Sequence, residues 1–526
     1  MIAVDWLRDA ALARPDAVAL EMPGRPPMSF AQLEARVVRL AGGLRSAGFS
    51  AGDRVVAVLP NGAAMVELLH AVPRLGGVLV PIDPRSTAVE IERARSLVGG
   101  KWLLLGPGAP GAVERSPWEG EVRLVHALED EILVDPAPSC DSLGAPPPAA
   151  LDLDRPHSVV FTSGTSGRPR PIVLTARNLL ASALASAERL GIRSDDRWLC
   201  TLPLHHVGGL SVLVRSVILG FTTVLHGRFE PNAVAEALID EGVDLVSLVP
   251  TTLRRTIEAL GTRAAGTRLR AILLGGAAAS PELLDRARAL GLPIAPTYGM
   301  TEAASQVATA APGDPCMAEG KVGRPLRGVV IRIVRGDDGV ASPGEPGEIL
   351  LAGPTISGGE MNADGSIRRT LVDGWLWTGD LGVLDGNGCL RILGRRDDMI
   401  VTGGENVAPD EVEAALLAHP WVAEAGVAGE PDPEWGEVVA AWIVPGPRIP
   451  TLEDLREHCR VTLAPHKLPR RLHILASLPR TSLGKLRRSE LRGTSLGPGP
   501  GTTRAVAAVA HENGAAPPSL GVKVRS

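Results

Sequence analysis

Residues 161–175, FTSGTSGRPRPIVLT, bring hydroxyl side chains, glycines and two arginines together between apolar segments. A loop of this composition offers many hydrogen-bond donors and two fixed positive charges, which suit an anion with several oxygen atoms. We therefore predict a polyphosphate site here. The pattern is weak by itself, because Ser/Thr/Gly loops after strands are often simple turns. It is not a Walker A loop, since no GxxxxGK[ST] pattern can be laid over it.

Length and composition narrow the class of protein. A chain of 526 residues has room for two or three domains. Its net charge of −5 gives no basic surface for nucleic acid, and no stretch approaches the roughly 18 apolar residues of a membrane span. Asp5, Arg8 and Asp9 interrupt the N-terminal apolar pattern, unlike the core of a signal peptide. We therefore expect a cytoplasmic protein without nucleic-acid partners or integral membrane contact.

The five cysteines lie far apart in the sequence, and none belongs to a CxxC pair. This spacing favours buried free thiols in a reducing cytoplasm over a metal site or a disulfide framework. The five positions are Cys140, Cys200, Cys316, Cys389 and Cys459.

The elements that position the loop follow an α/β pattern. Short apolar runs alternate with amphipathic segments from about residue 54 to residue 274, on both sides of a Pro/Ala-rich stretch near residues 136–150. This alternation predicts βαβ units with largely parallel sheets, arranged as two similar α/β halves. Beyond about residue 325, Gly-punctuated β-branched runs predict a β-rich subdomain of antiparallel strands.

The C-terminal part of the chain has a different pattern of helical and strand-like segments. Two helical segments between strand-like runs predict a small α+β domain after Gly394. Residues 493–526 are rich in Gly, Pro, Ala and Thr without apolar periodicity, so we expect a disordered tail. The predicted domains are therefore residues 1–394 and 398–492, joined by a hinge at 395–397.

Four further stretches follow the loop in a fixed order: PTYGMTEAAS (296–305), GWLWTGDLG (374–382), GRRDDMIVTGGENVAPDEVE (394–413) and LPRTSLGKLRR (478–488). Together with TSGTSGRPR they resemble the adenylate-forming superfamily of acyl-CoA synthetases, adenylation domains and luciferases. The resemblance spans residues 5–492. It implies an AMP-binding N-terminal domain, a mobile C-terminal domain, and the use of ATP, Mg²⁺ and coenzyme A.

The chemistry of such an enzyme explains these residue types. A carboxylate is a poor acyl donor, so its oxygen must first become part of a phosphate ester, which ATP supplies. The attack of one anion on another requires cations and fixed donors that hold the reacting groups in line. The resemblance implies that Thr301 contacts phosphate and that Glu302 binds Mg²⁺, which prefers a carboxylate with phosphate oxygens.

The resemblance also implies a nucleotide site. Tyr298, the only tyrosine of the chain, would stack on adenine, although a core aromatic is the alternative. Asp380 would accept hydrogen bonds from the ribose hydroxyls with support from Arg395, although an aspartate after glycine is often a turn residue. The full set of expected ATP ligands is Thr162, Ser163, Gly164, Thr165, Ser166, Gly167, Arg168, Gly275, Gly276, Ala277, Tyr298, Gly299, Asp380 and Arg395.

The small domain is implied to present two faces. Lys485 would enter the site for adenylation, and Gly403 and Gly404 would line the CoA channel for thiolation, with rotation about Asp397 exchanging them. For Lys485 the alternative is one solvated cation among neighbouring arginines. The sequence departs from the superfamily pattern at four positions: Arg168 and Arg170 replace lysines, Pro171 replaces a glycine, and Ala408 replaces a frequent aromatic residue.

Residues 202–220, LPLHHVGGLSVLVRSVILG, resemble the 2-succinylbenzoate–CoA ligases of menaquinone biosynthesis. The resemblance implies that His206 and Ser305 face the acid, while His205 stands where an aromatic residue is frequent. Arg215 interrupts an apolar helix, and it either extends to solvent or pairs with a second carboxylate of the substrate. Alternatives are another aryl- or acyl-CoA ligase, an enzyme loading a carrier protein, or a nucleotide sensor. The expected partners are small molecules, with a homodimer left open.

Overall fold

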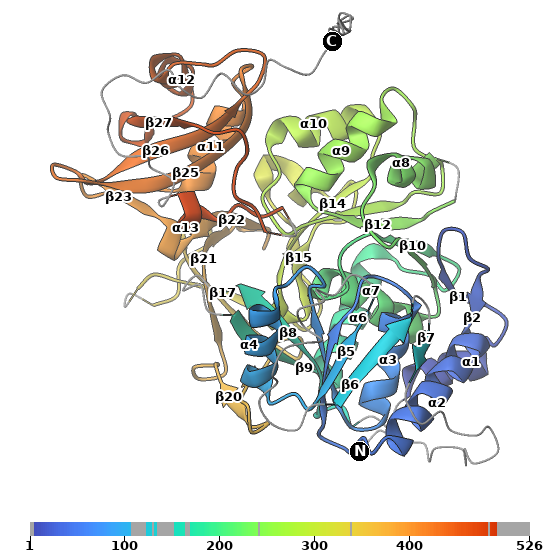
Figure 1. Cartoon of the computed structure of the whole chain (residues 1–526). Coiled ribbons are helices and arrows are strands. Elements are labelled where there is room, and N and C mark those ends of the chain that lie inside the picture. The colour runs from blue at the N-terminus through green and yellow to red at the C-terminus, as the bar shows by residue number, and fades with distance from the viewer. Residues whose placement is uncertain are drawn as a thin grey trace, which may run out of the picture.

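The computed structural model describes residues 5–106, 123–128, 131–133, 152–163, 169–239, 242–336, 339–481 and 484–491. A large domain carries most of the chain, and a smaller one follows β22 at the upper left of the view (Figure 1). Predictions for Cys140, for the loop residues 164–168 and for the tail at 493–526 lie outside the described residues. The mixed α/β architecture with a small C-terminal α+β unit confirms the predicted fold class.

The first sheet of the large domain has nine strands in the order β20-β19-β9-β8-β4-β3-β5-β6-β7. Its centre is parallel, and β-branched runs such as RVVAV form strands that are buried on both faces. The strands are β3 (Arg54–Val58), β4 (Val78–Ile82), β5 (Trp102–Leu105), β6 (Arg123–Leu128), β7 (Glu131–Leu133), β8 (Pro156–Ser163), β9 (Pro169–Thr175), β19 (Gly359–Met361) and β20 (Ile367–Arg369).

The second sheet also has nine strands, ordered β16-β15-β14-β13-β12-β10-β11-β1-β2. Its parallel strands end at one edge, where loops can build a site. The strands are β1 (Val18–Glu21), β2 (Met28–Ser29), β10 (Arg197–Cys200), β11 (Thr222–Leu225), β12 (Leu245–Leu248), β13 (Ala271–Leu274), β14 (Ile294–Met300), β15 (Ser305–Thr309) and β16 (Arg324–Pro325). The sheets do not divide where the predicted halves do. Strands β8 and β9, which follow the Pro/Ala-rich stretch, join the first sheet with β19 and β20, and β1 and β2 join the second.

Helices start where the sequence places capping residues. Ser29, Thr87 and Thr175 each close a capping box, which satisfies backbone N–H groups at three helix N-termini. The described helices of the large domain are α1 (Trp6–Ala13), α2 (Phe30–Ser46), α3 (Ala63–Arg74), α4 (Ala88–Val98), α6 (Ala176–Leu190), α7 (Val207–Leu219), α8 (Pro231–Ile239), α9 (Pro250–Leu260) and α10 (Pro281–Ala289). No helix among the described residues is long and apolar enough to cross a membrane.

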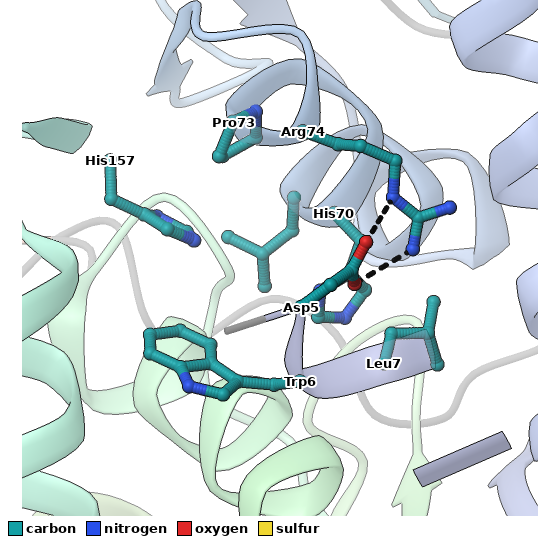
Figure 2. A pocket seen from close by; sticks show the side chains of 8 residues that line it. Asp5, Trp6, Leu7, His70, Pro73, Arg74 and His157 are labelled. Carbon is teal, nitrogen blue, oxygen red and sulfur yellow. Dashed lines mark hydrogen bonds and ion pairs between the residues drawn. The ribbon is translucent and has the colours of Figure 1, made fainter. Parts of the chain in front are cut away.

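The N-terminal end of α1 contacts α3 through an ion pair and β8 through a ring contact. Arg74 Nε lies 2.8 Å from Asp5 Oδ2, and Trp6 stacks on His157 (Figure 2). Burial lowers the pKa of His70 and of His157 to about 3, so both rings are neutral at neutral pH. None of the predicted site residues lines this small pocket, and its contacts fasten the N-terminal segment to the core.

The predicted antiparallel subdomain is a four-stranded sheet in the order β17-β18-β21-β22. Its strands are β17 (Val330–Val334), β18 (Gly347–Ala352), β21 (Leu376–Leu384) and β22 (Leu390–Arg395). The sheet ends at Arg395, and the 3₁₀ turn η4 (Arg396–Asp398) leads into the small domain.

The small domain is a sheet covered by short helices. Strand order is β24-β23-β26-β25, and β27 pairs with β26. Residues 400–468 supply one apolar cluster of their own, and Trp442 lies at the centre of a second. The elements are β23 (Ile400–Thr402), β24 (Glu405–Val407), α11 (Pro409–Leu417), β25 (Val422–Asp432), β26 (Gly436–Pro445), α12 (Leu452–Cys459), η5 (Pro465–Lys467), β27 (Arg471–Ile474) and α13 (Arg488–Leu491).

The thiol prediction is wrong for two of the cysteines. Cys316, in the turn η3 (Pro315–Gly320), and Cys389, beside β22, form a disulfide across a sequence separation of 73 residues. Backbone pairing between Gly323 and Leu390 brings the two segments together, a contact that cysteine spacing does not reveal. Cys200 and Cys459 are buried free thiols as predicted, and burial raises their pKa values to about 12 and about 11.

Candidate active site

Tyr298 and Asp380 meet between the second sheet and the antiparallel sheet. Tyr298 lies near the end of β14, and its hydroxyl donates a hydrogen bond of 2.6 Å to Oδ2 of Asp380 on β21. Burial first, and the charge of Asp380 second, raise the pKa of Tyr298 well above its ordinary value. The tyrosine therefore stays protonated and acts as a donor. The sequence predicted both residues for one site but not this direct contact.

Arg395 lies on the other side of the same carboxylate. The residues Asp380 and Arg395 are paired across β21 and β22, and Arg395 Nε lies 3.4 Å from Asp380 Oδ1. Arg395 also donates to the Thr378 carbonyl at 3.3 Å and covers Gly379, which has a φ of +72°. The turn before Asp380 is thus fixed from two sides, and the carboxylate is oriented before any ligand arrives.

The strand-end turn after β13 lies beside Tyr298. Leu274 pairs with Pro296, which places residues 275–277 next to residues 297–299. A Cβ on Gly275 would lie 2.7 Å from Thr297 Cγ2, and Gly276 has a φ of +82°. Both positions therefore require glycine. Gly276 and Ala277 are exposed, as expected for a flat surface that a planar ring can contact.

The described flanks of the predicted phosphate loop form an antiparallel strand pair, β8 with β9. Thr162 pairs with Arg170 and Phe161 pairs with Pro171, so the flanks of residues 161–175 are strands rather than loop. The hydroxyl of Thr162 is buried without a hydrogen-bond partner among the described residues. Arg170 forms an ion pair with Glu302 of the turn η2 (Thr301–Ala303). The structure therefore brings this strand pair and the TE pair of YGMTE together.

Arg215 is buried in α7, with 1% of its surface exposed. Its Nη2 lies 3.5 Å from Ser182 Oγ, its guanidinium lies 5.6 Å from the ring of Trp198, and its Nε has no partner in the described structure. Burial lowers the pKa of Arg215 to about 9, which leaves it charged at neutral pH. No carboxylate of the described chain pairs with it. The alternative in which Arg215 extends to solvent is thereby excluded.

The surroundings of Arg215 connect it to Ser305. Ser182 donates to the Ala304 carbonyl at 2.7 Å, and Ser211, one helical turn before Arg215, lies 3.4 Å from Ser305 Oγ. Sequence reasoning missed Ser182 and Ser211. The i, i+4 spacing within α7 could have identified Ser211, whereas Ser182 lies on another helix and gives no such signal.

His206 begins α7, and its ring lies 4.3 Å from that of His205. Burial lowers the pKa of His206 to about 3 and that of His205 to about 4, so both are neutral. His205 Nε2 lies 3.5 Å from Asp83 Oδ2 at the end of β4. A neutral His206 can accept or donate a hydrogen bond but adds no charge to the acid site.

Asn61, which the sequence did not identify, holds the loop before these histidines. Its amide donates to the carbonyls of Leu202 and His226 at 3.0 and 3.2 Å, and its carbonyl accepts from Leu204 N at 2.9 Å. Asn61 follows β3 of the first sheet, and its three partners lie in the segments that follow β10 and β11 of the second. One side chain therefore joins the two sheets at the loop that leads to His206.

Lys485 is exposed in a tight turn that reaches the large domain. The Thr481 backbone N–H donates to the Lys485 carbonyl at 2.8 Å, and Gly484 has a φ of +77°. A Cβ on Gly484 would lie 2.6 Å from Thr251 Oγ1 on α9. Thr251 follows Val249, whose side chain faces Gly276. The turn that carries Lys485 therefore packs beside the predicted nucleotide surface.

Gly403 and Gly404 lie elsewhere on the small domain. They form the turn between β23 and β24, where a Cβ on Gly403 would lie 2.7 Å from the ring of Trp435, while Gly404 meets open space. Strand β23 lies at the far left of the view, away from the large domain (Figure 1). The structure thus brings Lys485 to the nucleotide surface and does not bring Gly404 there.

Family models match both domains. The AMP-binding enzyme model matches residues 7–359, and the AMP-binding enzyme C-terminal domain matches residues 411–485. A 2-succinylbenzoate–CoA ligase of Bacillus cereus (strain Q1) is 35% identical over 489 residues, covering 93% of this chain and 98% of that protein.

The o-succinylbenzoate CoA synthetase of Bacillus subtilis is similar in three complexes. With the acyl-adenylate intermediate OSB-AMP it is 35% identical at a TM-score of 0.83, covering 93% of this chain and 98% of that one. With ATP and magnesium ion it is 36% identical at a TM-score of 0.83, covering 93% of this chain and 99% of that one. A double mutant bound to the product analogue OSB-NCoA, with 35% identity and 93% and 98% coverage, has a TM-score of 0.68. By TM-score, the structure of this chain is therefore more similar to the first two complexes than to the third.

Proposed function

The chain belongs to the AMP-binding enzyme family, and we propose that it is a 2-succinylbenzoate–CoA ligase. It converts 2-succinylbenzoate to 2-succinylbenzoyl-CoA through an acyl-adenylate, releasing pyrophosphate and AMP. The observation that carries this choice of acid is Arg215, a buried charged group without a carboxylate partner in the described structure. 2-Succinylbenzoate has one carboxylate to activate and a second to pair with this arginine, whereas benzoate or a fatty acid has only one.

Two half-reactions make up the proposed activity. In the first, an oxygen of the substrate carboxylate attacks the α-phosphorus of ATP, and the bond to pyrophosphate breaks. In the second, the CoA thiolate attacks the carbonyl carbon, and AMP leaves. The first step brings two anions together, so the protein has to supply cations and fixed donors.

The nucleotide is held by residues that are already oriented. Adenine would lie between Tyr298 and the glycine turn at Gly275 and Gly276, and Asp380 would accept hydrogen bonds from the ribose hydroxyls. Each oxygen of Asp380 already has a protein partner, Tyr298 or Arg395, and each keeps a further lone pair. Arg395 would support the ribose from the end of β22. Thr162, with its unpartnered hydroxyl, and Thr301 would donate to phosphate oxygens.

The residues present fit a magnesium ion. Glu302 offers a partly buried carboxylate beside the β8–β9 strand pair, and among the described residues no group of three or more acidic, His or Cys side chains could enclose a metal alone. This fits Mg²⁺, which usually takes one or two carboxylates and completes its shell with substrate phosphates and water. Glu302 would hold the ion, which supplies positive charge to the phosphates. Arg170, now paired with Glu302, would turn toward phosphate.

The acid would lie along the start of α7. Arg215 would pair with the second carboxylate, and His206 and Ser305 would provide neutral hydrogen bonds around the aromatic and keto groups. Ser182 connects Arg215 to the Ala304 carbonyl, and Ser211 contacts the Ser305 hydroxyl. Ala304 and Ser305 have positive φ values of 52° and 107°. These strained residues place the Ser305 side chain where it is needed.

The small domain would serve both half-reactions. Lys485, beside the nucleotide surface, would neutralise charge where the carboxylate meets the α-phosphate. Asp397, in η4 and 54% exposed, would act as the hinge. Rotation would remove Lys485 and bring Gly403 and Gly404 to line the path of CoA. We further propose a cytoplasmic location, and sedimentation of the purified protein tests whether it forms a homodimer.

Product analysis tests the function. The purified protein, supplied with 2-succinylbenzoate, ATP, Mg²⁺ and free CoA, is expected to give a product with the mass of succinylbenzoyl-CoA, together with pyrophosphate. Succinylbenzoate should be preferred to benzoate in the same pyrophosphate-release assay. A preference for monocarboxylic acids would contradict the choice of acid, and adenylate without thioester would indicate a carrier protein as acceptor.

A further inference from the structure

Glu348 is the second residue of β18, and its side chain is 8% exposed. Its two oxygens have different partners. Oε1 accepts a hydrogen bond of 3.2 Å from the Gly379 N–H, and Oε2 pairs with Nη1 of Arg396 at 2.7 Å. An irregularity in the pairing of β18 with β21 between Glu348 and Leu350 directs the side chain to this position.

The two partners of Glu348 belong to two different turns. Gly379 precedes Asp380, whose carboxylate meets Tyr298. Arg396 opens η4 and precedes Asp397. One carboxylate therefore connects the turn that orients the ribose acceptor with the turn that leads into the small domain.

We propose that Glu348 is a positioning residue that couples the nucleotide site to the orientation of the small domain. It holds η4 in the arrangement that presents Lys485 to the large domain. This inference rests on the proposed two-step function, because only an enzyme that alternates between two domain orientations needs such a contact.

The physical basis is the change of partners during rotation. Arg396 is 58% exposed and lies within the predicted hinge at 395–397, so a change in backbone dihedrals there moves its guanidinium away from Glu348. The buried carboxylate would then keep only the Gly379 N–H, and loss of a charged partner disfavours that state. The contact thus biases the population toward the arrangement seen here, and the bias disappears when either partner loses its charge.

Glu348→Gln keeps an acceptor for the Gly379 N–H and removes the charge. Adenylate formation from acid and ATP, followed by rapid quench, is expected to slow by about 5- to 10-fold. Conversion of supplied acyl-adenylate and CoA to thioester should stay within about twofold or become faster. Arg396→Gln should reproduce this split, and the double variant should be no slower than either single variant.

Glu360→Gln is the matched control. Glu360 is also a strand glutamate paired with a half-exposed arginine, Arg368, with side-chain exposures of 10% and 59%, but it lies on β19, away from the hinge. It should leave both half-reactions unchanged.

Three results would overturn the proposal: equal slowing of both half-reactions, independent effects of Glu348→Gln and Arg396→Gln, or a Glu348→Gln effect no larger than that of the control. If Glu348→Gln does not fold, Arg396→Gln decides, because its side chain is largely exposed. The assays use whichever acid the wild type activates. A wrong acid assignment would therefore appear in the wild type, separately from the variants.

Discussion

Arg215 in the large domain is buried and Arg488 in the small domain is mostly buried, with 14% of its side chain exposed, but their surroundings differ. Arg488 lies among three carboxylates, 3.3 Å from Asp398, 2.9 Å from Glu413 and in contact with Asp410. These charges raise its pKa despite burial. Arg215 contacts the Ser182 hydroxyl and the Trp198 ring, and burial alone lowers its pKa to about 9.

The contrast separates two uses of a buried cation. Arg488 is paired within the chain and joins α13 to α11 and to η4, so its charge serves the fold. Arg215 is desolvated without compensation, which costs stability unless a ligand provides the missing negative charge. A buried arginine is therefore informative about ligands only when its counter-charges have been examined.

The largest effect is expected for Arg488→Ala. Removing the guanidinium leaves three carboxylates facing one another in a partly buried site, which should lower the free energy of unfolding of the small domain by about 3–5 kcal/mol. Urea denaturation measures this loss. Arg487→Ala is the control, because Arg487 forms an exposed pair with Glu490 and should cost at most about 1 kcal/mol. A similar loss of unfolding free energy in both variants would contradict the structural role of Arg488.

Arg215→Ala should act on substrate use instead. Loss of the proposed charge pair should lower kcat/KM for 2-succinylbenzoate by an amount equivalent to about 2–5 kcal/mol, with the KM for ATP unchanged. Arg215→Lys should recover part of the loss, since it keeps the charge but not the planar fork. Steady-state kinetics with both acids make the comparison. A variant that still prefers succinylbenzoate as strongly as the wild type would place the second carboxylate elsewhere.

The carboxylates around Arg488 predict a pH effect. Burial, with Asp410 nearby, raises the pKa of Glu413 from 4.5 to about 7, so the folded state holds this proton more tightly than the unfolded state. The stabilisation from Glu413 is therefore complete below about pH 4.5 and is lost as pH rises through about 7. Glu413→Gln mimics the protonated form, and its stability relative to wild type should rise over that range. A constant difference between pH 4.5 and pH 8 in parallel denaturation series would contradict the raised pKa.

The smallest expected effect is a change in stability when Arg215, the other arginine of the comparison, is replaced. Arg215→Met removes an unpaired buried charge and should increase stability by about 1 kcal/mol, in contrast to Arg488→Ala. Differential scanning calorimetry measures the change. Addition of 2-succinylbenzoate should raise the melting temperature of the wild type only. Destabilisation of Arg215→Met would mean that its packing against Trp198 matters more than its charge.

Much of the fold was predictable because its elements are locally encoded. The alternation of apolar runs and amphipathic segments identified β3 to β5 with α3 and α4, and β10 to β13 with α7 and α8 but not α9, and the Gly-punctuated runs identified the antiparallel sheet. Motif order, through the family resemblance, placed Tyr298, Asp380 and Lys485 in one region.

The unpredicted features depend on contacts between distant segments. Asn61 is an ordinary residue after a strand until the loop at Leu202 packs on it, and the disulfide joins two cysteines that no motif connects. The charge state of Arg215 is also a property of its neighbours, since the sequence shows an arginine in an apolar helix but not the absence of counter-charges. Strand exchange between the sheets has no local signal either.

During synthesis of the chain, strand β1 is made long before its parallel partner β11. Leu20 and Glu21 pair with Thr223 and Val224, so about 200 residues separate the two strands. At a synthesis rate of about 5–20 residues per second, this interval lasts about 10–40 s. The central strands of the first sheet emerge during that time, while β1 has only the two-residue strand β2 beside it. The parallel edge of β1 is thus covered late, and a nascent chain stalled before β11 would present that unprotected strand edge to chaperones or to other chains.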